Sequence, residues 1–286
     1  MTRLPSLPAV LTLLAAVSLA AGAGAATITV GPSGDYANLY DAVANANPND
    51  VIEVANGTYS HTSTLTLDEP ITIRGASEAG VVLQMATAGW GINVAASDVT
   101  LERFTIQVVN TGDQGYAIHA HGGVPEIADL AISEVTVQGA AAGTQRRSGV
   151  DVNRVDGVTL TDVTSTDATW GVGFGISGCL DVTMTDVVTA GNAWGGIGIY
   201  CTDDPAGEPA RGSDNVTIVS ATNAEAIPIY REDEFGVVNT NITLPAAYQH
   251  VVRNETHRPD GDEFYFYRTD LADAVAAALA FTGYEA

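Results

Sequence analysis

The feature that most constrains the fold is a short apolar phrase that recurs five times between residues 99 and 230. Its copies, which start 24 to 34 residues apart, are Val99-Thr100-Leu101, Leu130-Ala131-Ile132, Val158-Thr159-Leu160, Val182-Thr183-Met184 and Val216-Thr217-Ile218. Strand-like repeats of about 20–30 residues are typical of a solenoid, in which each turn packs against its neighbours. No helical pattern separates the copies, so we predict a β-solenoid.

A second apolar alternation follows each phrase and predicts another wall of the coil. Its pairs are Tyr116/Ile118, Val150/Val152, Phe174/Ile176, Ile197/Ile199 and Ile227/Ile229. Because successive side chains of a strand point to opposite faces, the residues between these apolar ones should face solvent. The predicted fold class is all-β, with about seven or eight rungs.

The first 25 residues are set apart from the repeats. Arg3, an apolar run from Val10 to Ala21 and the small residues Ala23-Gly24-Ala25 are typical of a cleaved secretory signal peptide. We therefore predict a signal peptide over 1–25, a single domain over 26–286 and a secreted, extracellular location. A membrane anchor is the alternative, but the run is shorter than the about 20 apolar residues that a spanning helix needs.

Two short helices are expected to close the ends of the coil. Asp35 should cap the first helix, which ends before Pro48, and a second should begin at Asp270 and end before Gly283. The buried face of the first would carry Leu39, Ala42, Val43 and Ala46. Such helices would cover the apolar end and the unpaired strand edge of a terminal rung.

The order of the N-terminal segments resembles that of secreted right-handed parallel β-helix proteins, the pectin-lyase-like superfamily. The segments are a strand at 27–30, the Gly-Asp-Tyr helix, Asp50-Val51-Ile52-Glu53-Val54, Gly57-Thr58-Tyr59 and Ile71-Thr72-Ile73-Arg74-Gly75. The Val-Thr-Leu-Thr-Asp-Val phrase at 158–163 and its near copy at 182–187 resemble the repeats of that superfamily. The resemblance implies a right-handed parallel β-helix, but its members include lyases, hydrolases, esterases, epimerases, tailspikes and inert surface proteins.

The charge of the chain excludes several classes of partner. The formal net charge is −23, and all eleven basic residues are arginines. Such a surface repels nucleic acid and anionic membranes, so we expect no nucleic-acid partner, no membrane insertion and a monomer. A solubilising acidic coat is the simplest interpretation. Calcium is a possible ligand of the acidic runs at 203–208 and 232–234, and no motif requires another cofactor.

Two pairs of residues lie about one repeat apart and should therefore be neighbours in space. Cys179 and Cys201 are expected on adjacent rungs, where a disulfide and two buried free thiols are both possible. Trp170 and Trp194 are each followed by glycine and should also lie side by side. They are either exposed faces for sugar rings or buried under a loop.

The outward residues of the second alternation define a candidate site. We predict an exterior column of His119, Asn153, Ser177, Tyr200 and Tyr230. A neighbouring column would hold Ala117, Asp151, Gly175, Gly198 and Pro228, with His121, Arg154 and Arg231 just beyond. Five rungs make a polar strip about 19 Å long, which suits an extended polysaccharide. The alternative is that the outward residues of any solenoid are simply polar.

β-Elimination on a uronic acid polymer is the reaction that these side chains support best. It needs a cation for the carboxylate, a base for the C5 proton and an acid for the leaving oxygen. The candidates are Tyr200, Tyr230 and His119 as base and acid, and Arg231 as the cation. Hydrolysis would need two carboxylates, and only Asp151 lies clearly in the strip. The predicted substrate-binding residues are His121, Asn153, Arg154, Ser177, Trp170 and Trp194. A non-catalytic scaffold or glycan-binding protein is the competing class.

Overall fold

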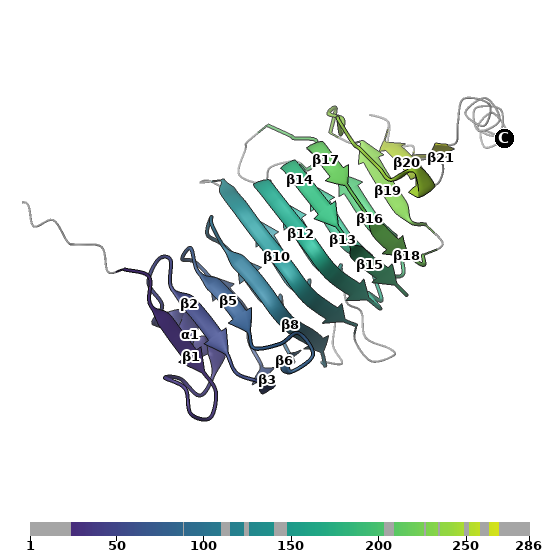
Figure 1. Cartoon of the computed structure of the whole chain (residues 1–286). Coiled ribbons are helices and arrows are strands. Elements are labelled where there is room, and N and C mark those ends of the chain that lie inside the picture. The colour runs from purple at the N-terminus through teal and green to yellow at the C-terminus, as the bar shows by residue number, and fades with distance from the viewer. Residues whose placement is uncertain are drawn as a thin grey trace, which may run out of the picture.

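The computed structural model describes residues 24–268, apart from 88, 110–114, 123–125, 140–147, 203–208, 226, 234, 249–251 and 258–262. The signal peptide and the C-terminal helix predicted from the sequence therefore lie outside the described residues. The described chain coils into stacked turns of short strands (Figure 1). None of its helices has the length and apolar character of a membrane span.

Two sheets run along the coil. Sheet A contains β1 (Thr27–Val30), β2 (Val51–Val54), β5 (Thr72–Gly75), β8 (Thr100–Val108), β10 (Ile127–Gln138), β12 (Val155–Thr166), β14 (Leu180–Thr185) and β17 (Asp214–Ile218) in this spatial order. Beside this path lie β3 (Gly57–His61), β6 (Val81–Met85), β15 (Val187–Ala190) and β18 (Ala221–Asn223). Sheet B contains, in spatial order, β4 (Leu65–Leu67), β7 (Ile92–Val94), β9 (Ile118–His121), β11 (Val150–Asn153), β13 (Val172–Ser177), β16 (Gly195–Tyr200), β19 (Ile229–Asp233), β20 (Val252–His257) and β21 (Glu263–Arg268).

The strand pairing identifies the architecture. Among the described strands, only β20 and β21 pair antiparallel; the others pair parallel with the strand one turn away. The predicted phrases align from turn to turn, because Val158 pairs with Leu130 and Val182, and Val182 pairs with Val216. The chain is a right-handed parallel β-helix. Eight strands stack along the main path of sheet A, as the predicted seven or eight rungs require.

Each long strand of sheet A bends at a residue with left-handed backbone. Arg103, Glu134 and Asp162 have φ angles of 64°, 50° and 53° and lie inside β8, β10 and β12. Asp186, with φ 52°, lies between β14 and β15 in the next turn. A left-handed residue breaks the strand's regular pleat, so the segments before and after it form two legs. Each turn therefore has three sides: two legs of sheet A and one strand of sheet B.

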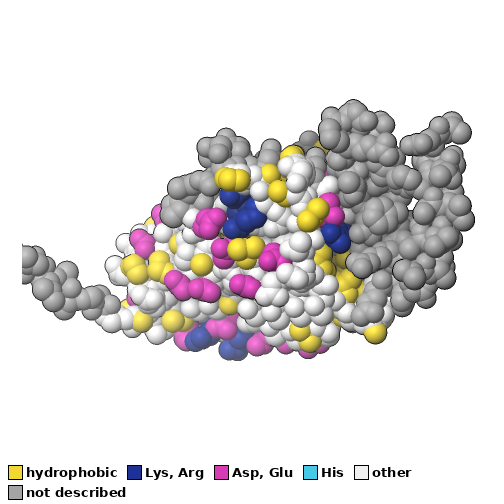
Figure 2. All heavy atoms as spheres, turned by 90° about the horizontal axis from the view of Figure 1, so that it is seen from above, with side chains coloured by type: hydrophobic (Ala, Val, Ile, Leu, Met, Phe, Trp, Pro, Cys, Tyr) yellow, Lys and Arg dark blue, Asp and Glu magenta, His cyan; other side chains and the backbone are white. Residues whose placement is uncertain are grey.

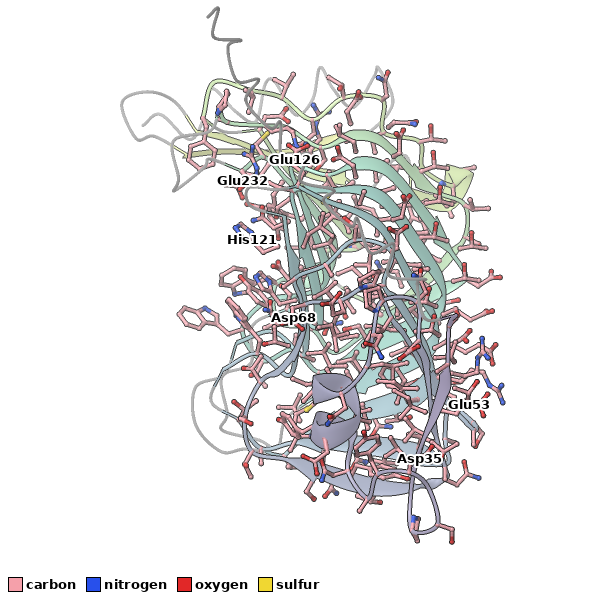
Figure 3. The ribbon with its side chains drawn as sticks, turned by 90° about the vertical axis from the view of Figure 1, so that its left-hand side faces the viewer. Asp35, Glu53, Asp68, His121, Glu126 and Glu232 are labelled. Carbon is pink, nitrogen blue, oxygen red and sulfur yellow. The ribbon has the colours of Figure 1, made fainter. Side chains whose placement is uncertain are left out.

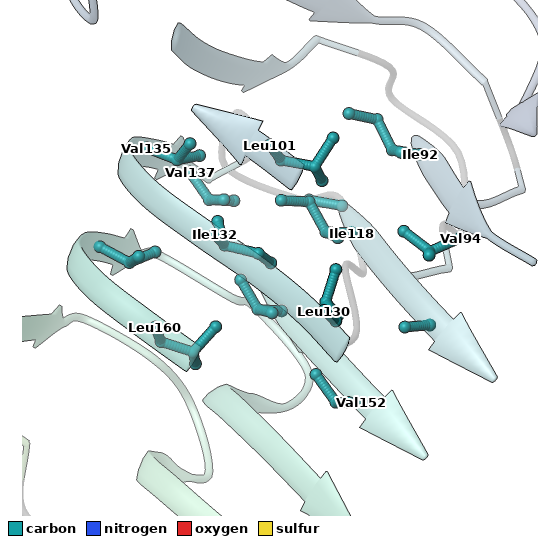
Figure 4. Packing of buried hydrophobic residues seen from close by; sticks show 14 of the residues in the cluster. Ile92, Val94, Leu101, Ile118, Leu130, Ile132, Val135, Val137, Val152 and Leu160 are labelled. Carbon is teal, nitrogen blue, oxygen red and sulfur yellow. The ribbon is translucent and has the colours of Figure 1, made fainter. Parts of the chain in front are cut away.

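Columns of aliphatic side chains fill the coil (Figure 4). In sheet A, Leu101, Ile132 and Leu160 occupy equivalent positions in successive turns and are at most 1% exposed. In sheet B, Ile118 and Val150 are paired and fully buried. Each such side chain contributes about 1.5–3 kcal/mol on burial, so the same apolar type recurs at the same register position.

Of the five core pairs predicted for sheet B, the middle three are correct, and the first and the last are each displaced by two residues. Val150 pairs with Ile118, so Ala120 rather than Tyr116 completes the first pair. Ile197 pairs with Ile229, so the last pair ends in Arg231 instead of beginning at residue 227. A shift of two residues keeps every side chain on the same face, so the apolar alternation alone could not detect it.

The N-terminal helix is confirmed, although its cap differs from the prediction. Helix α1 (Leu39–Ala44) packs against β1 and β2. Its N-cap is Asn38, whose side chain accepts a hydrogen bond from the amide of Asp41. The predicted cap, Asp35, instead accepts hydrogen bonds from the backbone amide and hydroxyl of Thr29, and these bonds lower the pKa of its carboxyl group.

Both cysteines are free, buried thiols. The register pairs Ser177 with Tyr200, so Cys179 lies two residues beyond a paired position and Cys201 only one. The two side chains therefore do not stack, and each thiol donates to a backbone carbonyl, at 3.3 Å for Cys179 and 3.4 Å for Cys201. Burial raises the pKa of Cys179 to about 12. Free thiols are thus the alternative that the structure contains.

Candidate functional site

The outward side chains of sheet B form two columns. The first column consists of Asn93, His119, Asp151, Gly175, Gly198 and Tyr230. The second column consists of His121, Asn153, Ser177, Tyr200 and Glu232. His121 projects from this side of the coil, whereas Glu53 of sheet A lies on the opposite side (Figure 3).

The register changes the membership of the predicted column. The sequence predicts His119 beside Asn153, whereas the structure pairs His119 with Asp151 and gives the place beside Asn153 to His121. Tyr230 likewise pairs with Gly198 rather than with Tyr200. The observed register places His119 and Asp151 next to each other in one column, a neighbour relation that the apolar alternation did not predict.

His119 and Asp151 form a covered polar pair. The Nδ1 atom of His119 lies 2.9 Å from Oδ2 of Asp151, and the two residues are only 6% and 8% exposed. Rings cover the imidazole: the centroids of Trp90 and Tyr116 lie 4.3 and 5.0 Å from that of His119, and His121 stacks at 5.9 Å. This contact holds the carboxylate in one orientation, and the rings shield the pair from water.

Two glycines in the first column leave room for polar groups from other positions. A Cβ atom at Gly175 would lie 2.9 Å from Oδ1 of Asp151, so this carboxylate reaches over Gly175. A Cβ atom at Gly198 would overlap the hydroxyl of Tyr200, whose side chain therefore lies over Gly198. The Tyr230 ring follows, 5.6 Å from that of Tyr200. A carboxylate and a phenol hydroxyl thus lie over neighbouring rungs, about 4.8 Å apart.

This arrangement decides which groups can act together. His119 lies on β9 and Gly198 on β16, three rungs away, which is about 14 Å. The imidazole and the Tyr200 hydroxyl are therefore too far apart to act on one bond. Asp151 and Tyr200 are the pair that places a carboxylate and a phenol hydroxyl over neighbouring rungs.

The structure does not bring Arg231 or Arg154 to this face. Arg231 shares the inward register of Ile199, opposite Tyr230, and its guanidinium lies 2.8 Å from the carboxylate of Asp233. Arg154 is 4% exposed and donates to a backbone carbonyl at 3.2 Å. Arg231, predicted as the cation, and Arg154, predicted as a substrate-binding residue, therefore do not lie on the outward face of sheet B.

Two further arginines of the described surface, Arg74 and Arg211, are held by acidic groups. Arg211 forms ion pairs with Glu126 at 3.2 Å, just before β10, and with Asp156 of β12 at 3.0 Å. Burial raises the pKa of Asp156, an effect that the neighbouring guanidinium opposes. Figure 2 shows arginine in only a few places, each beside acidic side chains. The net charge of −23 makes the field around the molecule as a whole negative.

The described residues contain no cluster of three or more His, Cys, Asp or Glu side chains in a metal-binding arrangement. The acidic run predicted as a calcium ligand at 203–208 lies outside them. In the second run, the described Asp233 is already paired with Arg231. Calcium therefore stays a prediction.

Four aromatic residues follow the N-terminal edge of sheet B, and we call them the aromatic rim. Trp90, Tyr116, Trp170 and Trp194 lie shortly before β7, β9, β13 and β16. The three tryptophans are 39%, 44% and 52% exposed in chain order. The rings of Trp170 and Trp194 meet edge to face, 6.0 Å apart at 88°. Trp170 and Trp194 are therefore neighbours, as predicted, and of the two alternatives they are exposed rather than buried under a loop.

No family model and no curated protein sequence matches the chain. Among solved structures, a pectin methylesterase in complex with a hexasaccharide is similar over 85% of both chains, at 14% identity and a TM-score of 0.49. A pectin methylesterase from Erwinia chrysanthemi is similar over 85% of both chains, at 13% identity and a TM-score of 0.35. A PL6 family alginate lyase is similar over 79% of this chain and 53% of its own, at 10% identity and a TM-score of 0.20.

Likenesses this distant concern the fold alone. The parallel β-helix that the sequence resemblance implies is confirmed by the pairing of parallel strands from turn to turn.

Proposed function

We propose that the protein is a secreted polysaccharide-processing enzyme, a lyase or a related enzyme, that binds an extended glycan along sheet B. One observation carries the proposal. The carboxylate of Asp151, held by His119, lies over one glycine rung, and the hydroxyl of Tyr200 lies over the next. Such a pair can serve as general base and general acid on one sugar unit.

β-Elimination uses both groups in one step. The carboxylate of Asp151 takes the proton from C5 of a uronate unit, and the electron pair forms the double bond between C4 and C5. The bond from C4 to the bridging oxygen breaks, and that oxygen takes the proton of the Tyr200 hydroxyl. Solvent then returns a proton to Tyr200 and removes one from Asp151. His119 orients the base through its Nδ1 contact.

The charge around the site sets a condition for this reaction. The chain carries a net charge of −23, and the nearest described arginines are bound elsewhere. A uronate would therefore bind together with a cation such as calcium, or at raised salt. Two-carboxylate hydrolysis fits less well, because Asp151 is the single acid of the first column.

The test is product formation on a panel of uronate-containing polymers, with and without calcium and salt. We expect an ultraviolet-absorbing unsaturated product, reduced about 100-fold or more in Asp151→Asn and in Tyr200→Phe. Asp181→Asn is the matched control, since it removes an exposed carboxylate on β14 of sheet A, away from the site. Equal rates in wild type, Asp151→Asn and Tyr200→Phe would remove this pair from the mechanism.

A glycan-binding protein without catalysis is the second candidate. The observation that favours it is the cover over His119 and Asp151, which leaves both less than 10% exposed. No unsaturated product and no new reducing ends on any polymer, together with retention on a glycan, would establish this alternative.

A further inference from the structure

The aromatic rim is an exposed apolar feature that the proposed reaction does not use. Its tryptophans expose 39% to 52% of their surface. Large aromatic side chains that stay exposed beside a polar face commonly mark a binding surface. The exposed rings of the rim are therefore a candidate binding surface.

The direction of the rim matches an extended chain. Its residues precede strands β7 to β16, which are four rung steps apart, so the rim runs about 19 Å along the coil axis. It also touches the first column, because the ring of Trp90 lies 4.3 Å from that of His119. A polymer lying along the axis can contact the rim and the column at once.

The charges beside the Trp170–Trp194 pair select the kind of sugar. Asp167 is exposed three residues before Trp170. The carboxylate of Glu225 binds the side chain of Asn192, two residues before Trp194. A negatively charged uronate would be repelled here, whereas an uncharged pyranose can stack the face that carries its C–H groups on an indole ring.

We propose that the aromatic rim binds uncharged pyranose units of a polysaccharide, with Trp170 and Trp194 as the anchor. The perpendicular rings give such a unit one face to stack on and one edge to abut. Combined with the proposed function, on which this last step rests, the substrate is a mixed polymer in which neutral sugars flank the uronate at Asp151.

Affinity electrophoresis tests the binding without requiring turnover. The full chain is run in gels that contain a neutral glucan or mannan, a homopolyuronate, or a polymer alternating uronate and neutral sugars. We expect retardation by the neutral or mixed polymers and about tenfold weaker retardation for Trp170→Ala/Trp194→Ala. Phe235→Ala is the matched control, because Phe235 is an aromatic residue of similar exposure, 46%, beyond the other end of β19.

Retardation by homopolyuronate alone, or equal retardation of the double variant and wild type, would overturn the inference. So would a complete lack of retardation in every gel. Asp151→Asn, run in the same gels, separates this inference from the proposed reaction. If it is retarded like wild type while product formation is lost, both stand. If wild type is retarded through Trp170 and Trp194 but never yields product, the rim stands and the reaction falls.

Discussion

Acidification should destabilise the N-terminal turns through His61. This residue ends β3, pairs in register with Met85 and is 1% exposed. The ring of Tyr40, from helix α1, covers it at a centroid distance of 4.9 Å. Neither ring nitrogen has a hydrogen-bond partner within the described structure. Burial therefore favours the neutral ring and lowers the pKa of His61 from 6.5 to about 4.

The size and the pH window of the effect follow from this shift. Above pH 6.5 the ring is neutral in both the folded and the unfolded chain, so the full stability is present. As the pH falls from 6.5 towards 4, the unfolded chain binds the proton first, and stability is lost at about 1.4 kcal/mol per pH unit. The total loss is about 3 kcal/mol, of which about 2.5 kcal/mol is reached at pH 4.5. A domain of ordinary stability would feel such a loss strongly.

Urea unfolding at pH 7 and pH 4.5 measures the effect. Wild type should lose about 2.5 kcal/mol more than His61→Leu between the two pH values, because the other titrating groups are common to both. If His61→Leu loses the same stability as wild type, the buried neutral imidazole is not the cause.

Three further predictions concern two glycines that other groups approach closely and one buried thiol. Gly75→Ala should lower the free energy of unfolding, measured in urea, by about 1–3 kcal/mol. The reason is that a Cβ atom at this position would overlap the backbone oxygen of Arg103, which cannot swing away as a side chain could. An unchanged midpoint of urea unfolding would contradict this close contact between Gly75 and Arg103. Gly198→Ala should displace the Tyr200 side chain and reduce product formation as Tyr200→Phe does, with stability within about 1 kcal/mol of wild type. Without reductant, iodoacetamide should label Cys179 only after denaturation, because burial raises the pKa of its thiol to about 12. Mass spectrometry of the denatured chain should then show both cysteines labelled. A disulfide would leave both unlabelled.

The coil could be predicted because its repeats restate the same apolar pattern at each turn. Leu130, Val158, Val182 and Val216 share one register position, as their phrases indicated. The strand at Thr27–Val30 has the predicted bounds. Strand β7 (Ile92–Val94) was not predicted, because three residues give no clear periodicity.

The contacts of the site were harder to predict than its face. An alternating pattern fixes whether His119 points outward, but not which residue of the next turn it meets. The two-residue shift at β9 separated His119 from Asp151 in the prediction, and the shift at β19 placed Tyr230 beside Tyr200 instead of beside Gly198. The cover over His119 depends on the ring of Trp90 from an earlier turn, and no local sequence pattern predicts such a contact.

The two glycines of the first column argue that this face does more than coat the coil. Glycine inside a strand weakens the strand, because the unfolded chain has more backbone entropy to lose there and glycine has no side chain to pack. Such a glycine often marks a place where another group approaches the backbone closely. A coil that only needed a polar surface would carry threonine at such positions, as sheet A does at 159 and 183. At Gly175 and Gly198 the missing side chains instead make room for the carboxylate of Asp151 and the hydroxyl of Tyr200. β-Branched residues at these two positions would make the strands more stable, but they would displace the carboxylate and the hydroxyl from the outer face of sheet B. The glycines are therefore best explained by the two polar groups that they accommodate.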